Sequence, residues 1–335
     1  MKQEEQPILV AIHCLVYNHE PYLRDCFEGF VMQKTNFRFV AIVHEDCSTD
    51  HSADIIREYE AKYPDIFRPI YEIENQWHKT DGSLGRIMNA AINATGAKYI
   101  AMCEGDDYWT DPYKLQKQVD FMEAHPECSL CCHRYKIYNQ SNSTWEDDYV
   151  NELFIERPNG FYFSNKDNFY TWITKTNTLL YRANAVNLVD LKKYKYSRDV
   201  HLNYHLLNEG KGFCLPFVAA VYRKQEGGVF SQLSTLEKQK ISFMIYQELL
   251  EHNQHDHDLQ VYFDFLQQNF EDNIRSIIYH RCRTYNIKEY YKLYLHYLIN
   301  KKGIKECMLF IKKMVKSYVK GVVNFGGVKK IISLL

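Results

Sequence analysis

The sequence lacks several features that would place it in common functional classes. GxxxxGK[ST] is absent and no GxGxxG follows the first apolar run, which argues against an ATPase or a dinucleotide-dependent enzyme. The 41 basic and 42 acidic residues give a formal net charge of -1, so no basic field favours nucleic acid as a partner. Internal repeats and low-complexity tracts are also missing.

Long apolar runs are absent as well. None approaches the ~20 residues that span a bilayer, and the polar, acidic start MKQEEQ is unlike a signal peptide. Ten cysteines are present but scattered, and many lie in apolar segments, where reduced cysteine packs as a small hydrophobe. The cluster Cys128, Cys131, Cys132 and His133 lacks a second half with metal-ligand spacing, which argues against zinc. We therefore expect reduced thiols and a cytoplasmic protein.

What the sequence does contain is an alternation of short apolar runs with amphipathic segments. Strands are predicted at 8–12, 37–43, 67–73 and 99–103, and the helices between and after them at about 21–30, 52–60, 81–94 and 114–124. Such alternation is typical of a mainly parallel α/β sheet.

The later part of the chain is less regular. Further strands are predicted at 129–138, 178–181 and 213–222, with a helix at 199–208, a long surface loop region at 139–168 and a flexible charged loop at 223–228. After residue 231 glycine and proline become rare and helix-forming residues dominate. We predict an α/β domain over residues 1–230 and a helical region over residues 231–335.

The end of the helical region has a basic amphipathic pattern. Apolar residues recur at alternating spacings of four and three, with lysines between them: Ile304, Met308, Ile311, Val315, Tyr318 and Val322, with Lys305, Lys312, Lys313, Lys316 and Lys320. One interpretation is peripheral contact of residues 304–323 with an anionic membrane surface. The other is a helix that packs on its own domain and turns its lysines to solvent.

Carboxylates follow two of the predicted strands. Glu104, Asp106 and Asp107 come directly after one, and Glu45 and Asp46 directly after another. The carboxyl ends of parallel strands meet at one edge of a sheet, where open α/β sheets bind ligands. Clustered carboxylates suit Mg²⁺ or Mn²⁺ holding a phosphorylated substrate, although a capping or calcium-type turn would use the same residue types.

The order of these motifs resembles family 2 glycosyltransferases, which have the GT-A fold, and in particular bacterial transferases that build surface polysaccharides. The resemblance covers about residues 7–230 and rests on four segments: VYNHEPYL at 16–23, HEDCSTD at 44–50, GAKYIAMCEGDDYWTDPYKLQKQVDFM at 96–122 and AVYRKQEGGV at 220–229. It implies a Rossmann-like, mixed but mainly parallel sheet flanked by helices, here with a helical C-terminal extension.

The resemblance also implies roles for individual residues. Those matching the nucleotide-sugar-binding positions are Val16, Tyr17, Asn18, Glu20, Asp46, Asp106 and Arg223. Within this set, Asp46 is expected at the base or ribose and Arg223 at the diphosphate. Asp107, together with Asp106, matches the metal-binding carboxylates, while Glu104 is expected to support their loop.

Two further positions bear on catalysis. Asp199 matches the general base of inverting members and begins a predicted helix, where a carboxylate is electrostatically stabilised; a plain helix-terminal charge is the simpler interpretation. Gln225 stands where many relatives have histidine. A neutral amide is a poor metal ligand, which makes the use of metal at this position a departure from the family pattern.

The resemblance therefore predicts an inverting glycosyltransferase of polysaccharide biosynthesis. It would use Mn²⁺ or Mg²⁺ to move a sugar from a nucleotide-diphosphate donor, with a UDP-sugar favoured, to a hydroxyl of a glycan or lipid-linked acceptor. Its location would be cytoplasmic, with contact at the inner face of the cell membrane. The alternatives are a nucleotidyltransferase and a non-catalytic carbohydrate- or partner-binding protein on a degenerate transferase scaffold.

Overall fold

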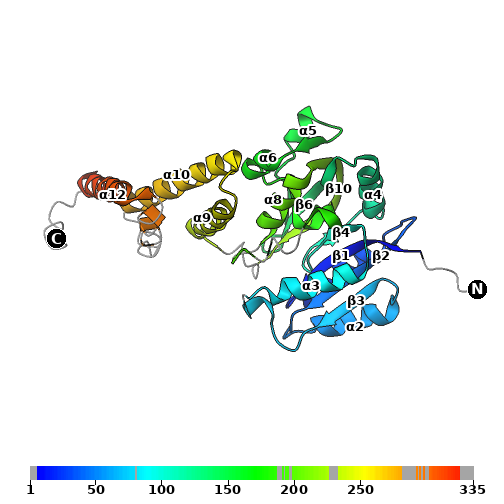
Figure 1. The fold of residues 1–335 in the computed structure, drawn as a ribbon. Coiled ribbons are helices and arrows are strands. Elements are labelled where there is room, and N and C mark those ends of the chain that lie inside the picture. Colours follow the sequence, from blue (N-terminus) through cyan, green and yellow to red (C-terminus); the bar gives the residue numbers. More distant parts are fainter. Residues whose placement is uncertain are drawn as a thin grey trace, which may run out of the picture. The chain divides into compact units, whose positions relative to one another are not determined.

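The computed structural model describes residues 6–79, 81–186, 191, 193–195, 198–225, 233–280, 292, 294–295, 297–298 and 302–324. The chain divides into two compact units, Met1–Ser231 and Gln232–Leu335, and each is described by itself (Figure 1).

The first unit alternates strands and helices along its N-terminal half. Its elements are β1 (Ile8–Val16), α1 (Glu20–Val31), β2 (Arg38–Glu45), α2 (Ser52–Lys62), β3 (Phe67–Tyr71), η1 (Trp77–Lys79), α3 (Ser83–Ala94), β4 (Tyr99–Met102), β5 (Tyr108–Trp109), α4 (Lys114–Ala124), β6 (Cys128–Asn139), β7 (Thr144–Asp147), α5 (Leu153–Glu156), β8 (Phe161–Phe163), α6 (Asn165–Tyr170), η2 (Thr176–Thr178), β9 (Leu180–Arg182), η3 (Ala183–Ala185), α8 (Asp199–Glu209) and β10 (Lys211–Lys224).

The described strands form one mixed sheet with the order β3-β2-β1-β4-β9-β6-β10-β5. Strands β3, β2, β1 and β4 are mutually parallel. Strand β9 is antiparallel to both β4 and β6, whereas β10 runs parallel to β6. This arrangement confirms the predicted α/β class with a mixed, mainly parallel sheet flanked by helices.

Helices cover both faces of the sheet, so its central strands are buried on both sides. Alternate residues of β1 divide between two hydrophobic cores, with Val10 and Ile12 in one and Ala11 in the other. Helices α1, α2 and α4 contribute to the first core, and α3 and α8 to the second (Figure 1). Burial on both faces explains why β1 is a continuous apolar run rather than an alternating one.

The prediction of a long surface loop over residues 139–168 is wrong. The segment contains β7, α5, β8 and α6. Strand β7 forms a hairpin with β6, and β8 pairs with β10 and buries Phe161 and Phe163. Elements of three to six residues are too short to produce a readable period, which is why the sequence did not reveal them.

The charged loop predicted at 223–228 begins later than expected. Arg223 and Lys224 continue β10, where they pair with Tyr138 and Asn139 of β6. Residues 226–228 lie outside the described residues.

The cysteine cluster of β6 also has a structural explanation. Cys131 packs in the first hydrophobic core and Cys132 in the second, because successive side chains of a strand point to opposite faces. The two thiols therefore cannot bind one ion together. The nine described cysteines are free thiols.

Lys114 is a fully buried cation at the first residue of α4. Its Nζ atom has no hydrogen-bond partner in the described part of the chain and lies 3.8 Å from the centroid of the Trp109 ring. Burial lowers the pKa of Lys114 to about 7. The unfolded chain keeps this amine protonated up to about pH 10, so the unfolded state binds more protons between these values and stability rises with pH across that window.

Lys114→Met is expected to raise the free energy of unfolding at pH 7 by about 1–3 kcal/mol, the range for an unsatisfied buried polar group. The gain should shrink as the pH approaches about 10, because the wild-type amine then folds without losing a proton. Urea unfolding across this pH range measures the difference. Lys34→Met, at an exposed lysine, is the control, and a gain independent of pH would contradict the assignment.

The second unit is helical in its described residues. It contains α9 (Thr235–His252), α10 (His257–His280) and α12 (Ile304–Asn324). Aromatic side chains form much of its core: Phe243, Phe263, Phe270, Tyr294, Tyr297 and Phe310. A capping box begins α9, in which Ser234 Oγ accepts from the Glu237 N–H and the Ser234 N–H donates to Glu237 Oε2 at 2.8 Å. None of the described helices is both long and apolar enough to cross a membrane.

Candidate active site

The carboxyl ends of β2, β1 and β4 lie side by side at one edge of the sheet, and each opens into a loop. Main-chain hydrogen bonds tie these loops to the end of β1. The Asp46 N–H donates to the Val16 carbonyl, and the Gly105 N–H donates to the Leu15 carbonyl, both at 3.0 Å. The two acidic loops predicted to share an edge therefore flank the same strand.

Gly105 allows the loop after β4 to pass close to α1. A Cβ atom at this position would lie 2.8 Å from His19 Nδ1 and 3.0 Å from Val16. Those distances are shorter than normal Cβ contacts, so a larger residue here would force the His19 or Val16 side chain to shift, and glycine permits the close approach. The carboxylates of residues 104, 106 and 107 are thereby held against the loop that follows β1.

The loops after β1 and β2 exchange hydrogen bonds. Asn18 has a positive φ of 53°; its N–H donates to Ser48 Oγ at 3.0 Å, and its Oδ1 accepts from the Thr49 N–H at 2.8 Å. The Glu20 N–H donates to Asp50 Oδ2, while Glu20 Oε2 accepts from the His51 N–H, both at 3.0 Å. Asn18 and Glu20, both predicted nucleotide-binding residues, therefore brace the two loops.

Asp46 holds a third segment in place. Its carboxylate is almost fully buried and accepts from the Gln76 N–H at 2.6 Å and from the Trp77 N–H at 3.1 Å. Both oxygens are therefore engaged by main chain in the free protein. The side chains of Tyr17 and Trp77 are exposed near this point, and Arg198 lies 5.8 Å from the Trp77 ring centroid. A contact of Asp46 with a base or ribose stays a prediction, and Trp77 is a candidate that the sequence did not suggest.

Asp107 and Asp106 occupy different environments within the acidic loop. Asp107 is 3% exposed and its Oδ1 accepts from the Arg223 N–H at 2.8 Å. Burial and the negative charge of Asp106 raise the pKa of Asp107 well above its usual range. Asp106 is more accessible, and its Oδ2 accepts from Gln225 Nε2 at 2.7 Å. The amide of Gln225 thus bonds to one of the two carboxylates predicted to bind metal.

Arg223 reaches this loop because β10 pairs with β5, which follows the loop directly. Its Nε donates to the Asp106 carbonyl at 3.0 Å, and its guanidinium forms an ion pair with Asp25. The rings of Tyr22 and Tyr108 lie 5.2 and 4.7 Å from it. In the free protein Arg223 is therefore hydrogen-bonded to the acidic loop. Its contact with a diphosphate stays a prediction.

Asp199 begins α8, and its Oδ1 accepts from the Val200 N–H at 2.9 Å. Its side chain is accessible to solvent, yet desolvation by the surrounding protein raises its pKa. Glu104 is likewise accessible, and desolvation, with the charges of Asp106 and Asp199, raises the pKa of Glu104 to about 7. These interactions place Asp199 within electrostatic reach of the acidic loop. A carboxylate with a raised pKa suits general-base chemistry near neutral pH.

Lys175 is a residue of this site that the sequence did not suggest. It precedes η2, and its Nζ lies 3.2 Å from the centroid of the Tyr222 ring. The pKa of Lys175 is lowered, because desolvation outweighs the charges of the four carboxylates that raise it, namely Asp107, Asp199, Glu104 and Asp106. A single lysine in the segment TWITKTNT carries no motif, so only the fold reveals its position.

The side chains of this site can be checked for the ligands that the predicted metal ion would need. No group of three or more His, Cys, Asp or Glu within the described ranges has the arrangement of a metal site. Mg²⁺ and Mn²⁺ nevertheless need only one or two carboxylates when a diphosphate and water complete the shell. Asp106 and Asp107 fit that limited donor set, with Gln225 supplying an amide where a third ligand could stand.

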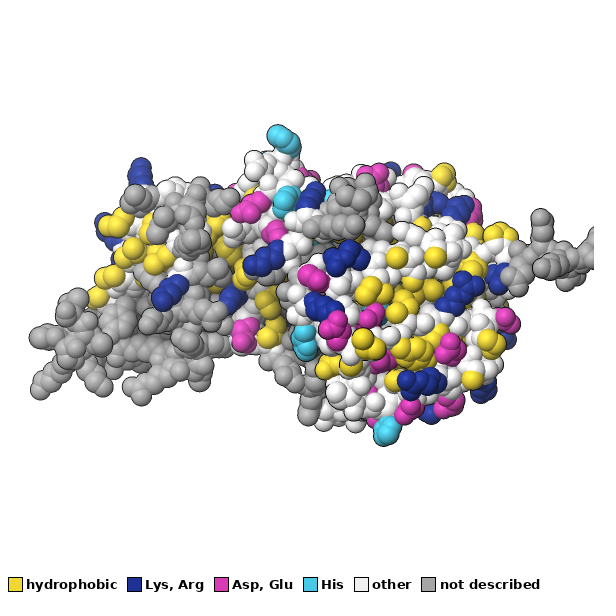
Figure 2. Space-filling model, turned by 60° about the horizontal axis from the view of Figure 1, so that its bottom comes forward, with side chains coloured by type: hydrophobic (Ala, Val, Ile, Leu, Met, Phe, Trp, Pro, Cys, Tyr) yellow, Lys and Arg dark blue, Asp and Glu magenta, His cyan; other side chains and the backbone are white. Residues whose placement is uncertain are grey.

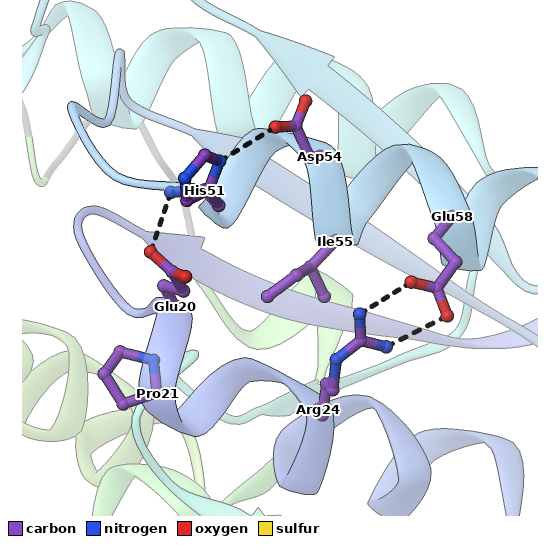
Figure 3. Close-up of a pocket in the computed structure, with 7 residues that line it drawn as sticks. All are labelled: Glu20, Pro21, Arg24, His51, Asp54, Ile55 and Glu58. Atoms are coloured by element: carbon purple, nitrogen blue, oxygen red, sulfur yellow. Dashed lines mark hydrogen bonds and ion pairs between the residues drawn. The ribbon is translucent and has the colours of Figure 1, made fainter.

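A separate pocket of about 580 Å³ is lined by residues of α1 and α2 and by His51, which precedes α2. Figure 3 shows its lining from α1 and α2, where Arg24 forms a bidentate pair with Glu58 at 2.7 and 2.9 Å and His51 contacts Asp54. Its charged side chains already satisfy one another. The acidic loop does not line it, so we place the candidate active site at the carboxylates and not in this pocket.

Comparisons with known proteins agree on one family. The model for "Glycosyl transferase family 2" matches residues 12–188. An uncharacterised protein of Mycobacterium tuberculosis is 31% identical over 234 residues, which is 68% of this chain and 62% of that protein. TuaG of Bacillus subtilis, whose name describes a teichuronic acid biosynthesis glycosyltransferase, is 28% identical over 40% of this chain and 50% of its own length. The chain thus spans about three fifths or less of these relatives.

Solved structures show the same fold at lower identity. Residues 1–349 of TarS from S. aureus, in complex with UDP-GlcNAc, match with a TM-score of 0.59 at 16% identity, covering 96% of this chain and 93% of that one. The mannosyltransferase PcManGT from Pyrobaculum calidifontis, in complex with GDP-Man and Mn²⁺, matches with a TM-score of 0.54 at 11% identity, covering 97% and 91%.

Proposed function

The chain belongs to glycosyl transferase family 2, and from this premise we propose that it moves a sugar from a nucleotide-diphosphate donor to a hydroxyl group with inversion at the anomeric carbon. One observation supports the proposal: Glu104, Asp106 and Asp107 follow β4 at the carboxyl edge of the sheet, and their charges act on Lys175 together with that of Asp199. That edge is where open α/β sheets bind nucleotides.

The chemistry requires a base on one side of the sugar and stabilisation of charge on the other. Asp199 takes the proton of the acceptor hydroxyl, whose oxygen then bonds to the anomeric carbon. The bond from that carbon to the phosphate oxygen breaks, and the nucleoside diphosphate leaves with the electron pair. Asp106 and Asp107 would hold a divalent cation, which, when bound, neutralises charge on the leaving diphosphate. The loops after β1 and β2, which are hydrogen-bonded to each other, contribute to the rate by positioning the reactants.

The donor and acceptor are proposed by chemical class. Two fold neighbours were solved with UDP-GlcNAc and with GDP-Man, which supports a nucleotide-diphosphate sugar; we propose a UDP-sugar as the first to test. We propose as acceptor a hydroxyl of a glycan or lipid-linked glycan in polysaccharide biosynthesis, in line with the name of TuaG.

One observation favours a second candidate. The Gln225 amide donates a hydrogen bond to an oxygen of Asp106, one of the two carboxylates predicted to bind metal. A degenerate, non-catalytic carbohydrate-binding scaffold would allow such a bond, because it needs no metal there. A thermal-shift screen with UDP-, GDP-, CMP- and dTDP-sugars, with and without Mn²⁺, tests both candidates. Stabilisation by at least one nucleotide sugar supports the transferase, whereas failure of every donor to shift the melting temperature would contradict it.

We further propose that α12 contacts the inner face of the cell membrane. Its exposed side chains include Met308, Leu309, Val315 and Val319, and Lys305, Lys312 and Lys316 lie exposed between them. Figure 2 shows hydrophobic side chains beside lysine and arginine side chains on this part of the chain. An apolar face interleaved with lysines is complementary to anionic lipid.

Val315→Glu is expected to weaken binding to vesicles that contain phosphatidylserine about tenfold, because burying a valine contributes about 1.5 kcal/mol. Co-sedimentation with vesicles of phosphatidylcholine, with and without phosphatidylserine, measures the effect. The matched control is Val261→Glu, at an exposed valine of α10. Equal binding by the two variants, or no binding by the wild type, would rule out membrane contact through α12.

A further inference from the structure

Lys175 differs from the other charged residues of the candidate site because its charge has no direct partner in the described part of the chain. Arg223 is committed to Asp25, to the Asp106 carbonyl and to two tyrosine rings. Lys175 instead has its Nζ above the Tyr222 ring, at 3.2 Å from the centroid, and forms no ion pair with any residue that the structure describes. An ammonium group over an aromatic face is attracted to the ring without using its N–H donors in hydrogen bonds.

The backbone around Lys175 fixes this placement. The Lys175 carbonyl accepts from the Thr178 N–H at 2.9 Å and from Thr178 Oγ1 at 2.7 Å. Asn177 then ties η2 to β10 through its Nδ2, which donates to the Val221 carbonyl at 3.0 Å, and its own carbonyl accepts from Trp109 Nε1 at 2.8 Å. The segment that carries the lysine is therefore bonded to β10 and to β5, and β5 directly follows the acidic loop.

The charges that act on Lys175 come from four carboxylates. Burial raises the pKa of Glu104, Asp107 and Asp199, and the positive charge of Lys175 partly opposes that rise at all three carboxyls. Its Nζ lies over Tyr222, the residue before Arg223, whose N–H donates to Asp107, so the lysine is close to the acidic loop. At the same time, Gln225 Nε2 donates to Asp106 Oδ2, so one oxygen of the carboxylates predicted to bind metal is already engaged.

On the premise of the proposed function, we propose that Lys175 is a resident cation that binds the diphosphate of the donor and supplies part of the positive charge that a metal alone would otherwise provide. Its N–H donors have no hydrogen-bond partner among the described residues, and its side chain is partly accessible. A charge-assisted hydrogen bond to phosphate is among the stronger polar contacts in proteins. Binding of nucleoside diphosphates should consequently persist when metal is removed.

Calorimetric titration of the full chain with UDP, GDP and dTDP, in EDTA and in Mn²⁺, tests this proposal. In EDTA we expect Lys175→Met to bind about 10–100-fold more weakly than the wild type and Lys175→Gln to behave similarly, whereas Lys175→Arg, which keeps a positive charge that can donate to phosphate, should bind more tightly than either. The difference should be smaller in Mn²⁺. Lys98→Met is the matched control, because Lys98 also lies over a tyrosine ring, 5.3 Å from the centroid, but pairs with Glu123.

The outcomes separate this inference from the proposed function. Wild-type protein that binds a nucleotide only with Mn²⁺, or folded Lys175→Met and Lys175→Gln variants that bind as tightly as the wild type in EDTA, would overturn the role of Lys175 alone. Wild-type protein that binds none of the three nucleotides even with Mn²⁺ would overturn the proposed function and this inference with it.

Discussion

Replacing Asp199 by asparagine is expected to lower the rate of donor cleavage about 10²–10⁴-fold, the range that a positioned general base contributes. Asparagine keeps the side-chain oxygen that accepts from the Val200 N–H at 2.9 Å, so the start of α8 should be preserved. Only the ability to take a proton is lost. The release of nucleoside diphosphate, with water or a glycan as acceptor, measures the rate.

Two further measurements make the result for Asp199 specific. Asp199→Asn should still bind the nucleoside diphosphate, since the residue acts on the acceptor side. Asp120→Asn, at an exposed carboxylate of α4 that accepts from Gln116, should keep wild-type rates. A folded Asp199→Asn protein with the wild-type rate would reduce Asp199 to a helix-terminal charge.

Asp107→Asn is expected to lower donor cleavage in Mn²⁺ about 10²–10³-fold, comparable with the loss of one group that stabilises a developing negative charge. The substitution retains the oxygen that accepts from the Arg223 N–H at 2.8 Å, and it removes a buried negative charge. We therefore expect the variant to fold at least as stably as the wild type. The same release assay, with a thermal melt of each protein, gives both quantities.

The control for Asp107 is Asp147→Asn, at an exposed residue of the β7 hairpin that pairs with Lys136. It removes the same charge outside the acidic loop, on a strand separated from β5 by β6 and β10, and should leave cleavage unchanged. If Asp107→Asn kept full activity, or lost activity only because it unfolded, a functional role for this carboxylate would be untenable.

The acidic loop and its strand could be predicted from sequence because their signals are local. A continuous apolar run at 99–103 requires a strand buried on both faces, and the carboxylates after it must leave the core. Asp199 could be singled out because it matches the general-base position of the family that the motifs resemble, and its place at the start of a helix agrees with that. In each case the neighbours along the chain determine the environment of the residue.

Lys175 could not be predicted because long-range pairing determines its position. Strand β9 follows it and inserts antiparallel between β4 and β6, which brings η2 beside the acidic loop. Nothing between residues 171 and 178 encodes that insertion. The role of Asp46 was hidden for the same reason, because its partners at Gln76 and Trp77 lie 30 and 31 residues away.

The short elements between 139 and 170 depend on pairing with strands that are already formed. Phe161 and Phe163 of β8 are buried against β10, yet three residues alone give no reliable period. The Asn-rich composition between 139 and 168 instead suggested a loop. Tertiary packing, rather than local preference, decides the structure of this segment.

Proton NMR of the sugar during turnover tests the central claim most directly. The wild-type chain is incubated with Mn²⁺ and each of a UDP-, GDP- and dTDP-sugar, and the anomeric proton of the donor and of the first product is followed. We predict that at least one donor is consumed and that the first product has the inverted anomeric configuration. A product with the donor's own configuration, or no consumption of any of the three donors, would contradict the account.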